Sequence, residues 1–317
     1  MLPRQFIISV ALLARAAWAA PRLLNTSVLV LDNGLPPMDL LQPSEDLIAA
    51  HMELAEEERL YKRNLDTFAP LDVEVYMHVI TRTVEGQQNA TTEILAAMMQ
   101  KMNDVFAPGK ISFHLIGTRY LVHERWAQGY EEDEMKAQLR KGTMRTLNLY
   151  LVESLQPDPR APWFVPYGDA SCPDELKRKG LAQDGVTIAI ETLPGGRATQ
   201  RNRGGTCLHK LGVWFGLTHT FRFTCDGPGD FVDDTPAELG PSSSCEIRDS
   251  CPDQPGKDPI HNFMDWSPDE CLKEFTPGQF TRMHSLWNKF RAVDDEPSAT
   301  REQEPAIPEV ANGINRL

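Results

Sequence analysis

The spacing of apolar residues predicts a chain in which strands and helices follow one another between about residues 44 and 290. Apolar residues alternate with polar ones or form short runs, as in β-strands, in the segments 73–79, 111–115, 147–151 and 184–190. Helical spacing or capping residues predict helices in the segments 44–61, 92–106, 131–141 and 277–290. Strands interleaved with helices are typical of a domain in which helices cover a sheet.

The two ends of the chain differ from this central part. Residues 1–20 combine an early arginine, an apolar stretch and a small-residue ending, which is the pattern of a secretory signal peptide. Arg15 interrupts the apolar stretch, so a buried helix is the alternative. Residues 21–70 are expected to form an N-terminal arm or a prosegment, residues 71–291 the main domain, and residues 292–317 a disordered acidic tail. The chain is therefore predicted to be secreted and extracellular.

Charge and composition narrow the range of partners. The 317 residues carry a formal net charge of −13, and such an acidic surface repels nucleic acid and anionic lipid. After the signal no run of about 18 apolar residues occurs, so no membrane-spanning helix is expected. With 41% apolar residues the chain can bury a core of its own, and we expect a monomer without nucleic-acid or membrane partners.

The cysteines are confined to one part of the chain. All six lie between residues 172 and 271, which fits disulfide bonds formed in an oxidising compartment. The alternative, a zinc cluster, usually contains Cys-x-x-Cys pairs, and the chain has none. Asn25 and Asn89 each begin an Asn-x-Ser/Thr tripeptide and are predicted glycosylation acceptors in a secreted chain.

The segment 207–220 has the frame of a zinc-protease helix. In the motif His-Glu-x-x-His, two imidazoles four residues apart share one helix face and grip one zinc ion, while the glutamate takes the proton of the zinc-bound water. A glycine three residues later lets the chain turn, so that a third histidine reaches the metal. In this chain the three ligand positions hold His209, Val213 and His219, the base position holds Lys210, and the glycine is Gly216.

This segment and three later blocks, CDGPGDFVDDTP, DPIHNFMDWSPDEC and FTPGQFTRM, resemble the secreted pappalysin-type (cytophagalysin) metalloproteases, which are metzincins. The resemblance extends from about Val73 to Arg291. It implies a zincin-like α/β (α+β) fold with a twisted mixed sheet, a central metal-site helix at about 205–216 and a loop-rich C-terminal half held by disulfides. It also implies one catalytic zinc and the hydrolysis of peptide bonds.

The same resemblance assigns roles to residues outside the helix. The disulfides that it implies are Cys225–Cys251 and Cys245–Cys271. Cys172 and Cys207 are left as a candidate further pair. Met264 becomes the Met-turn residue below the metal site. Trp266 stands where family members carry a tyrosine, and an indole cannot supply that phenol to the reaction centre.

Two residues of the helix depart from the family's motif, which reads His-Glu-x-Gly-His. Lys210 is cationic and cannot take a proton from water, and a cation beside Zn²⁺ adds repulsion. Val213 removes one ligand, whereas catalytic zinc sites usually have three from the protein. His209 and His219 would then be either weak residual ligands or two hydrogen-bonded polar residues. The candidates for a substitute ligand that approaches in space are Asp226, Asp230 and His261.

A group of aspartates follows the helix. Asp230, Asp233 and Asp234 are candidates for a structural calcium site, since calcium prefers carboxylate and carbonyl oxygens in loops, and family members carry calcium near this loop. The alternative is that they are turn residues and helix caps.

The altered helix decides the functional prediction. We expect a secreted pseudoprotease that binds a peptide or protein ligand in the former cleft, with zinc lost or weakly held. The alternative is an active zinc endopeptidase that uses a substitute ligand and base. A sequence error is a third explanation, but Glu to Lys needs one base change, His to Val needs two, and Trp266 is a separate departure.

Overall fold

The structure, a computed structural model, describes residues 43–61, 63–159 and 161–292. The predicted signal peptide, the acceptor Asn25 and residues 293–317 of the predicted tail lie outside the described residues. No helix in the described ranges is long and apolar enough to cross a membrane.

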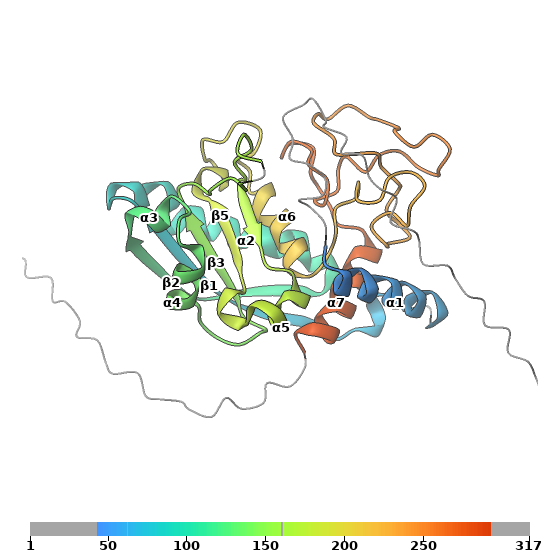
Figure 1. Ribbon diagram of the computed structural model, residues 1–317, viewed down its shortest axis with the longest axis horizontal. Helices are drawn as coiled ribbons and strands as arrows, with labels where there is room; N and C mark the ends of the chain where they lie inside the picture. The colour runs from blue at the N-terminus through green and yellow to red at the C-terminus, as the bar shows by residue number, and fades with distance from the viewer. Residues whose placement is uncertain (1–42, 62, 160, 293–317) are drawn as a thin grey trace, which may run out of the picture. The chain divides into compact units, whose positions relative to one another are not determined.

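The described part contains a five-stranded sheet with the strand order β2-β1-β3-β5-β4, seen on the left in Figure 1. Its strands are β1 (Leu71–Thr81), β2 (Ile111–Val122), β3 (Leu147–Val152), β4 (Gly168–Ala170) and β5 (Val186–Ala189). Four strands run parallel, and only β4 pairs antiparallel, at the edge next to β5. This confirms the expected mixed sheet and all four expected strands.

Two features of the sheet were not expected from the alternation. Strand β2 continues to Val122 because β1 pairs with it along its whole length, from Leu71 opposite Ile111 to Thr81 opposite Val122. Strand β4 forms between the third and fourth expected strands, where the alternation predicts no strand. A strand of three residues is too short to show an alternation of apolar and polar positions. Strand β4 is defined by its antiparallel pairing with β5.

The helices surround the sheet and cover both of its faces. They are α1 (Glu45–Tyr61), α2 (Thr92–Phe106), α3 (Glu124–Ala127), α4 (Glu132–Leu139), α5 (Leu176–Lys179), α6 (Gly205–Trp214) and α7 (Pro277–Phe290). Short 3-10 helices occupy Leu65–Thr67, Glu85–Ala90, Ala107–Gly109, Pro173–Glu175, Leu181–Gln183 and Ile190–Thr192. Two side chains cap helix starts: Ser44 Oγ accepts a hydrogen bond from the Leu47 amide, and the Thr91 side chain caps α2.

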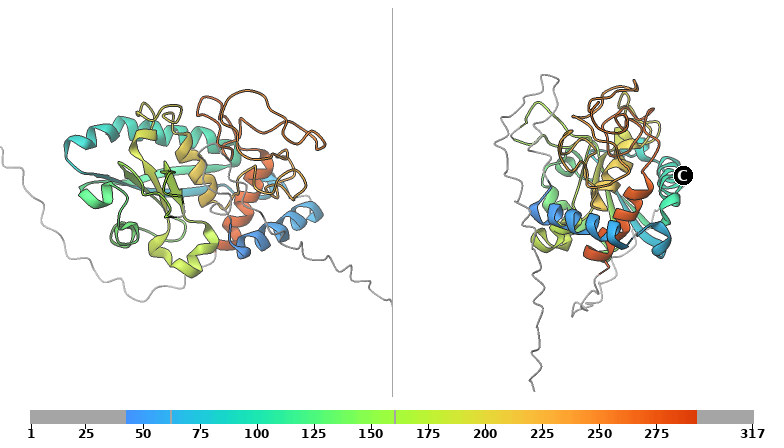
Figure 2. Two further views of the ribbon diagram at one scale, coloured as in Figure 1. Left: turned by 45° about the horizontal axis from the view of Figure 1, so that its top comes forward. Right: turned by 90° about the vertical axis from the view of Figure 1, so that its right-hand side faces the viewer.

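The alternating strand residues divide the core into two layers. Val75 and Leu149 face a large core shared with α2, α6 and α7, while Tyr150 and Val152 face a smaller one with α3 and α4. The two sides of the sheet can be followed in Figure 2. The former metal-site helix α6 is therefore held on one face of the sheet by buried apolar side chains.

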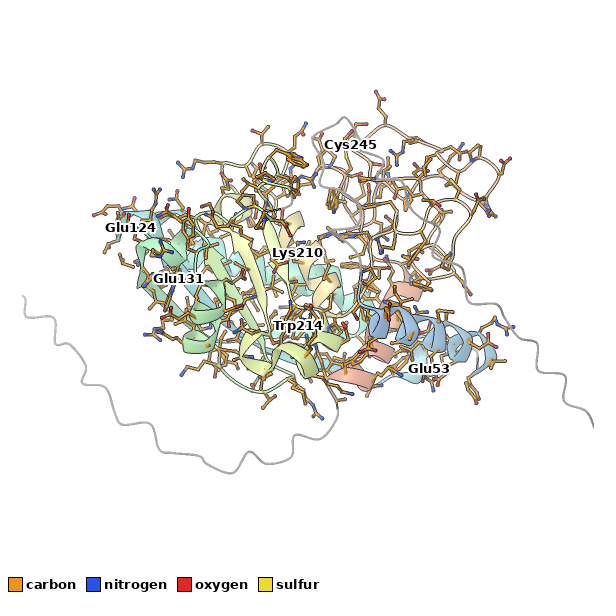
Figure 3. All side chains as sticks on the ribbon, in the orientation of Figure 1. Glu53, Glu124, Glu131, Lys210, Trp214 and Cys245 are labelled. Carbon is orange, nitrogen blue, oxygen red and sulfur yellow. A yellow bond between two sulfur atoms is a disulfide. The ribbon has the colours of Figure 1, made fainter. Side chains whose placement is uncertain are left out.

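The chain between α6 and α7 is held by disulfides. Its described residues form no helix or strand, only an isolated bridge between Asn262 and Glu274, as expected for a loop-rich C-terminal half. The disulfides in it are those that the resemblance implies, Cys225–Cys251 and Cys245–Cys271 (Cys245 is labelled in Figure 3).

The candidate pairing of Cys172 with Cys207 is wrong, because both are free thiols. Cys207 lies on α6 in the large core, whereas Cys172 packs against a separate cluster that α1 and α7 form around Leu286. Burial raises the pKa of the Cys207 thiol to about 12, so it is uncharged at neutral pH.

Part of the expected N-terminal arm packs on the domain. Helix α1 lies beside α7 in Figures 1 and 2, and Leu47, Ala50 and Leu54 contact Leu286 there. On the same helix, His51 Nε2 donates a hydrogen bond to the Gly216 carbonyl at 2.9 Å. The arm thereby contacts the turn that follows α6. Whether residues 21–70 are removed from the mature protein stays a prediction.

Candidate active site

Helix α6 is positioned by residues from the C-terminal loops. Asp269 Oδ2 accepts hydrogen bonds from the Gly205 and Arg203 amides at 3.1 and 2.7 Å, which caps the start of the helix. A Cβ atom on Gly212 would lie 2.4 Å from Met264 Sδ, so a glycine there lets Met264 lie directly against the helix. The chain then turns at Gly216, whose φ of 98° favours glycine.

The structure brings His209 and His219 together. Their Nε2 atoms are 3.2 Å apart, their rings stack with centroids 5.1 Å apart, and both side chains are buried. His209 Nδ1 donates a hydrogen bond to the Phe263 carbonyl at 2.7 Å. A neutral imidazole carries a single N–H, and in His209 it is on Nδ1, so its Nε2 can only accept. In the hydrogen bond between the two rings, His219 Nε2 is therefore the donor.

Both imidazoles are neutral at physiological pH. Burial, helped by the charges of Lys210 and Arg201, lowers the pKa of His209 to about 3 against the opposing effect of the Phe263 carbonyl. Burial also lowers the pKa of His219 well below its usual value, with further lowering by His209, Lys210 and Arg222. The charges that act on the pair are therefore all positive.

The histidine pair keeps part of the geometry of a zinc site. Two nitrogens at about 2.0–2.1 Å from one tetrahedral zinc are about 3.3 Å apart, close to the observed 3.2 Å. A hydrogen bond from the second ring nitrogen to a carbonyl is also usual for a zinc-binding histidine, and His209 has one. The third ligand position is Val213, a hydrocarbon side chain that packs partly into the large core.

Among the residues that the structure describes, no substitute ligand joins the pair. Nowhere in the described ranges do three His, Cys, Asp or Glu side chains gather as a metal site. Asp226 is exposed, Asp230 accepts a hydrogen bond from the Val232 amide at 3.0 Å, and His261 Nδ1 donates to the Cys271 carbonyl at 2.7 Å. The described residues therefore do not fit a catalytic zinc ion, which needs three protein ligands.

Lys210 projects from α6 at the position of the missing base (labelled in Figure 3). It is half-buried, and its stem lies against β4, since a Cβ atom on Gly168 would be 3.2 Å from Lys210 Cγ. Burial lowers the pKa of the ammonium, while the charge of Asp169 opposes the shift. The ammonium donates no hydrogen bond to any residue that the structure describes.

Aromatic rings form the wall beside His219. The Trp266 ring meets His219 edge-on at 5.6 Å, contacts Phe221 at 5.4 Å and stacks on Phe164 at 6.1 Å. The Trp266 carbonyl accepts a hydrogen bond from Arg201 at 2.6 Å. The place of the family's tyrosine is thus filled by an apolar ring with no hydroxyl group.

Sequence reasoning did not find Arg222. Its backbone amide donates a hydrogen bond to the His219 carbonyl at 3.2 Å, and its side chain is buried. The only local hint is that Arg222, a basic residue in an acidic chain, follows the ligand position His219 by three residues. That spacing belongs to no known motif.

The aspartates after the helix serve as turn and cap residues. Besides its bond to the Val232 amide, Asp230 accepts one from Thr235 Oγ1 at 2.5 Å, and burial raises its pKa to about 7. Asp234 accepts from the Gly278 amide at 2.8 Å and from Thr276 at 2.6 Å, at the start of α7. Asp233 is exposed. These contacts favour the turn and helix-cap interpretation over calcium ligands.

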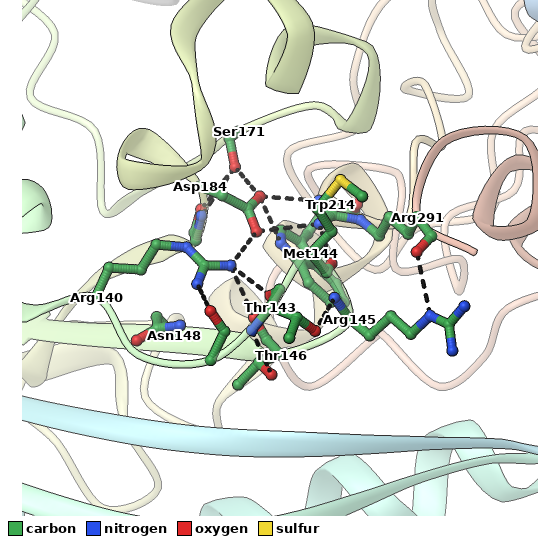
Figure 4. Close-up of polar contacts among 12 residues, drawn as sticks. Arg140, Thr143, Met144, Arg145, Thr146, Asn148, Ser171, Asp184, Trp214 and Arg291 are labelled. Carbon is green, nitrogen blue, oxygen red and sulfur yellow. Dashed lines mark hydrogen bonds and ion pairs between the residues drawn. The ribbon is translucent and has the colours of Figure 1, made fainter. Parts of the chain in front are cut away.

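A second polar cluster lies at the other end of α6 and is centred on Asp184 (Figure 4). Its carboxylate accepts hydrogen bonds from Arg291 at 3.0 Å with both oxygens, and from Trp214 Nε1 at 3.0 Å. Ser171 and Arg140 donate two more, at 2.8 and 3.3 Å. Burial alone would raise the pKa of Asp184, but the charges of Arg291 and Arg140 outweigh it and lower the pKa.

A cavity of about 790 Å³ lies away from the histidine pair, at the carboxyl ends of β1, β3 and β5. Arg82, Glu153, Glu191 and Arg197 are among its lining residues. The predicted glycosylation acceptor Asn89 is exposed at this cavity, and glycosylation there stays a prediction.

Known proteins resemble this chain over most of its length. An extracellular metalloprotease of Neurospora crassa is 41% identical over 283 residues, which cover 87% of this chain and 96% of the relative. The family model for M43 peptidases, described as pregnancy-associated plasma protein-A, matches residues 167–288. The chain belongs to the M43 metalloprotease family. An extracellular metalloprotease of Pyricularia oryzae is 43% identical to this M43 chain over 256 residues, covering 79% of it and 88% of the relative.

A solved structure confirms the fold of this M43 protein. Mirolysin in complex with compound 9 superposes with a TM-score of 0.59 at 22% identity, covering 70% of this chain and 93% of mirolysin. The pappalysin-type resemblance and the metzincin-like fold are therefore confirmed, and the protein is extracellular like its relatives. The family is one of zinc metalloproteases, so the misfit of the zinc site is a property of this chain's own residues.

Proposed function

We propose that this M43 protein is a pseudoprotease that binds an extended peptide or protein segment in the former cleft without cleaving it. One observation carries the proposal: the two remaining ligand histidines are hydrogen-bonded to each other, and the third ligand position is Val213. A chain with two imidazoles and no third ligand lacks the usual protein donors of a catalytic zinc.

Lys210 supports the loss of hydrolysis independently of the ligand count. A general base must accept a proton from water, and an ammonium carries none of the lone pairs that this step needs. Loss of general acid and base assistance alone lowers a rate by about 10²- to 10⁴-fold. The half-buried Lys210 therefore makes slow turnover the expectation even if a metal were held weakly.

The sheet edge supports binding of an extended segment. The Tyr167 carbonyl accepts a hydrogen bond from the Ala189 amide of β5, and the Ser171 amide donates one to the carbonyl of Gly185, just before β5. By alternation, Gly168 and Ala170 direct their backbone groups away from β5, at the edge of the sheet. An added peptide strand can pair with such an edge. Just before β4, Trp163 and Val165 are exposed at every second position, with exposed fractions of 59% and 52%. This row offers apolar contacts to the side chains of such a strand.

An active zinc endopeptidase remains the second candidate because the Nε2 separation of 3.2 Å suits two zinc ligands. It would need a further ligand and a base from groups that do not approach the pair in the described residues.

The test is the zinc content of the purified secreted protein, measured by elemental analysis, with casein cleavage assayed in parallel. Wild type is compared with the double variant Lys210→Glu, Val213→His and with Lys210→Glu alone as the matched control. We expect wild type and the single variant to lack stoichiometric zinc and activity, and the double variant to gain both. Stoichiometric zinc and chelator-sensitive cleavage in wild type would overturn the proposal.

A further inference from the structure

Arg222 is a buried cation without a hydrogen-bonded partner among the residues that the structure describes. The residue is only 4% exposed, and none of the three guanidinium nitrogens donates a hydrogen bond to a described residue. Burial lowers its pKa to about 10, which leaves the group charged at neutral pH. A buried charge with no paired group is strongly unfavourable, so an anion is expected to bind at this position.

The other buried arginines show what Arg222 lacks. Of the described residues, three arginines are buried, and the other two pair with a carboxylate: Arg282 with Glu58 at 2.9 Å and Arg291 with Asp184 at 3.0 Å. No carboxylate contributes to the pKa of Arg222. Its guanidinium carbon lies 5.0 Å from the centre of the Phe223 ring, a contact that satisfies none of its N–H donors.

Arg222 is tied to the former metal site. Its amide donates a hydrogen bond to the His219 carbonyl, and Lys210 directly follows His209 on α6. The chain, whose net charge is −13, therefore places two cations without a hydrogen-bonded partner in the described residues close to the two histidines in sequence. The planar guanidinium matches a carboxylate through two parallel hydrogen bonds.

We propose that Arg222 binds a carboxylate of the peptide that occupies the former cleft, with Lys210 as the second cation. The ligand class is thus an acidic peptide, in which an Asp or Glu side chain or a free C-terminus takes the place beside His219 that the metal has in active relatives. The inference deepens the proposed function and rests on it.

The first experiment tests the carboxylate site without a peptide. Thermal unfolding is followed in sodium acetate and in sodium chloride at equal ionic strength, for wild type and for Arg222→Met, Arg222→Lys and Arg203→Met. Arg203, an arginine with a side chain 62% exposed, is the matched control. We expect acetate to raise Tm in wild type and Arg203→Met, weakly in Arg222→Lys, and not in Arg222→Met. Equal shifts in wild type and Arg222→Met, or no shift in either, would overturn the inference.

The second experiment uses three fluorescein-labelled heptapeptides whose binding is measured by polarisation. One has a central Glu and an amidated C-terminus, one has Gln in its place, and one has Gln with a free C-terminus. We expect wild type to bind at least one carboxylate peptide about tenfold or more tighter than the amidated Gln peptide, and Arg222→Met to lose this preference. Which of the two carboxylate peptides gains affinity identifies the source of the carboxylate.

The outcomes separate this inference from the proposed function. Equal binding of all three peptides by wild type would refute the acidic preference and leave peptide binding intact. Binding of none, together with an acetate effect that depends on Arg222, would keep the carboxylate site and refute the proposed peptide-binding function.

Discussion

Helix α6 carries two polar clusters that differ in how well their charges are paired. At its C-terminal end, the Asp184 carboxylate accepts hydrogen bonds from two arginines, a tryptophan and a serine (Figure 4). In the former metal site, two neutral histidines bond to each other, and the cations Lys210 and Arg222 have no anionic hydrogen-bond partner in the described residues. A buried charge that serves the fold is paired within the fold. The carboxylate ligand that we propose would supply the missing partner for these two cations.

The largest expected loss of stability comes from a substitution that breaks the paired cluster around Asp184. Asp184→Ala leaves Arg291 buried without its carboxylate, and breaking a buried ion pair costs about 3–5 kcal/mol. The free energy of unfolding in urea measures the loss. Asp253→Ala, at an exposed aspartate, is the control and should change stability by less than about 0.5 kcal/mol. A loss at Asp184 as small as the control's would show that the cluster contributes no stability.

The second prediction is a gain in stability when the charge of Arg222 is removed, which would separate this arginine from the paired ones. Arg222→Met removes an unpaired buried charge and leaves an apolar side chain of similar length, so it should stabilise the ligand-free protein by about 1–2 kcal/mol. The same substitution at the paired arginine, Arg282→Met, leaves Glu58 without its partner and should destabilise the protein. Denaturant unfolding of both variants at pH 7 is the measurement. If both variants lose stability alike, Arg222 is paired in solution and the contrast fails.

The smallest effect is a pH dependence that belongs to the paired cluster. The folded pKa of Asp184 lies below its unfolded value of about 3.9, so its stabilising contribution is fully present above that pH. As pH falls through the folded pKa the contribution is lost, at up to about 1.4 kcal/mol per pH unit. The difference in unfolding free energy between wild type and Asp184→Asn should be constant from pH 5 to 7 and shrink below about pH 4. A difference that shrinks between pH 7 and 5 would contradict this assignment.

Local patterns predicted much of the fold because they act over a few residues. The alternation at 73–79 predicts a strand because side chains point to opposite faces of a sheet in turn. Thr91 caps α2 by accepting a hydrogen bond from the amide of Ile94, only three residues away. The family's motif likewise marked His209 and His219 as neighbours in space, and their side chains are in contact.

Other features depend on partners distant in the sequence, and no local pattern carries them. Strand β4 exists through its pairing with β5, and Cys172 and Cys207 stay apart because they pack into different cores. The separation of the two histidine nitrogens depends on where the loops after α6 pack. So does the lack of a hydrogen-bonded partner for Arg222 among the described residues. The sequence therefore determines which residues occupy the altered site, because the motif is defined by spacing along the chain. Only the tertiary structure decides which charged groups are paired, because pairing requires residues distant in the sequence to lie within hydrogen-bond distance.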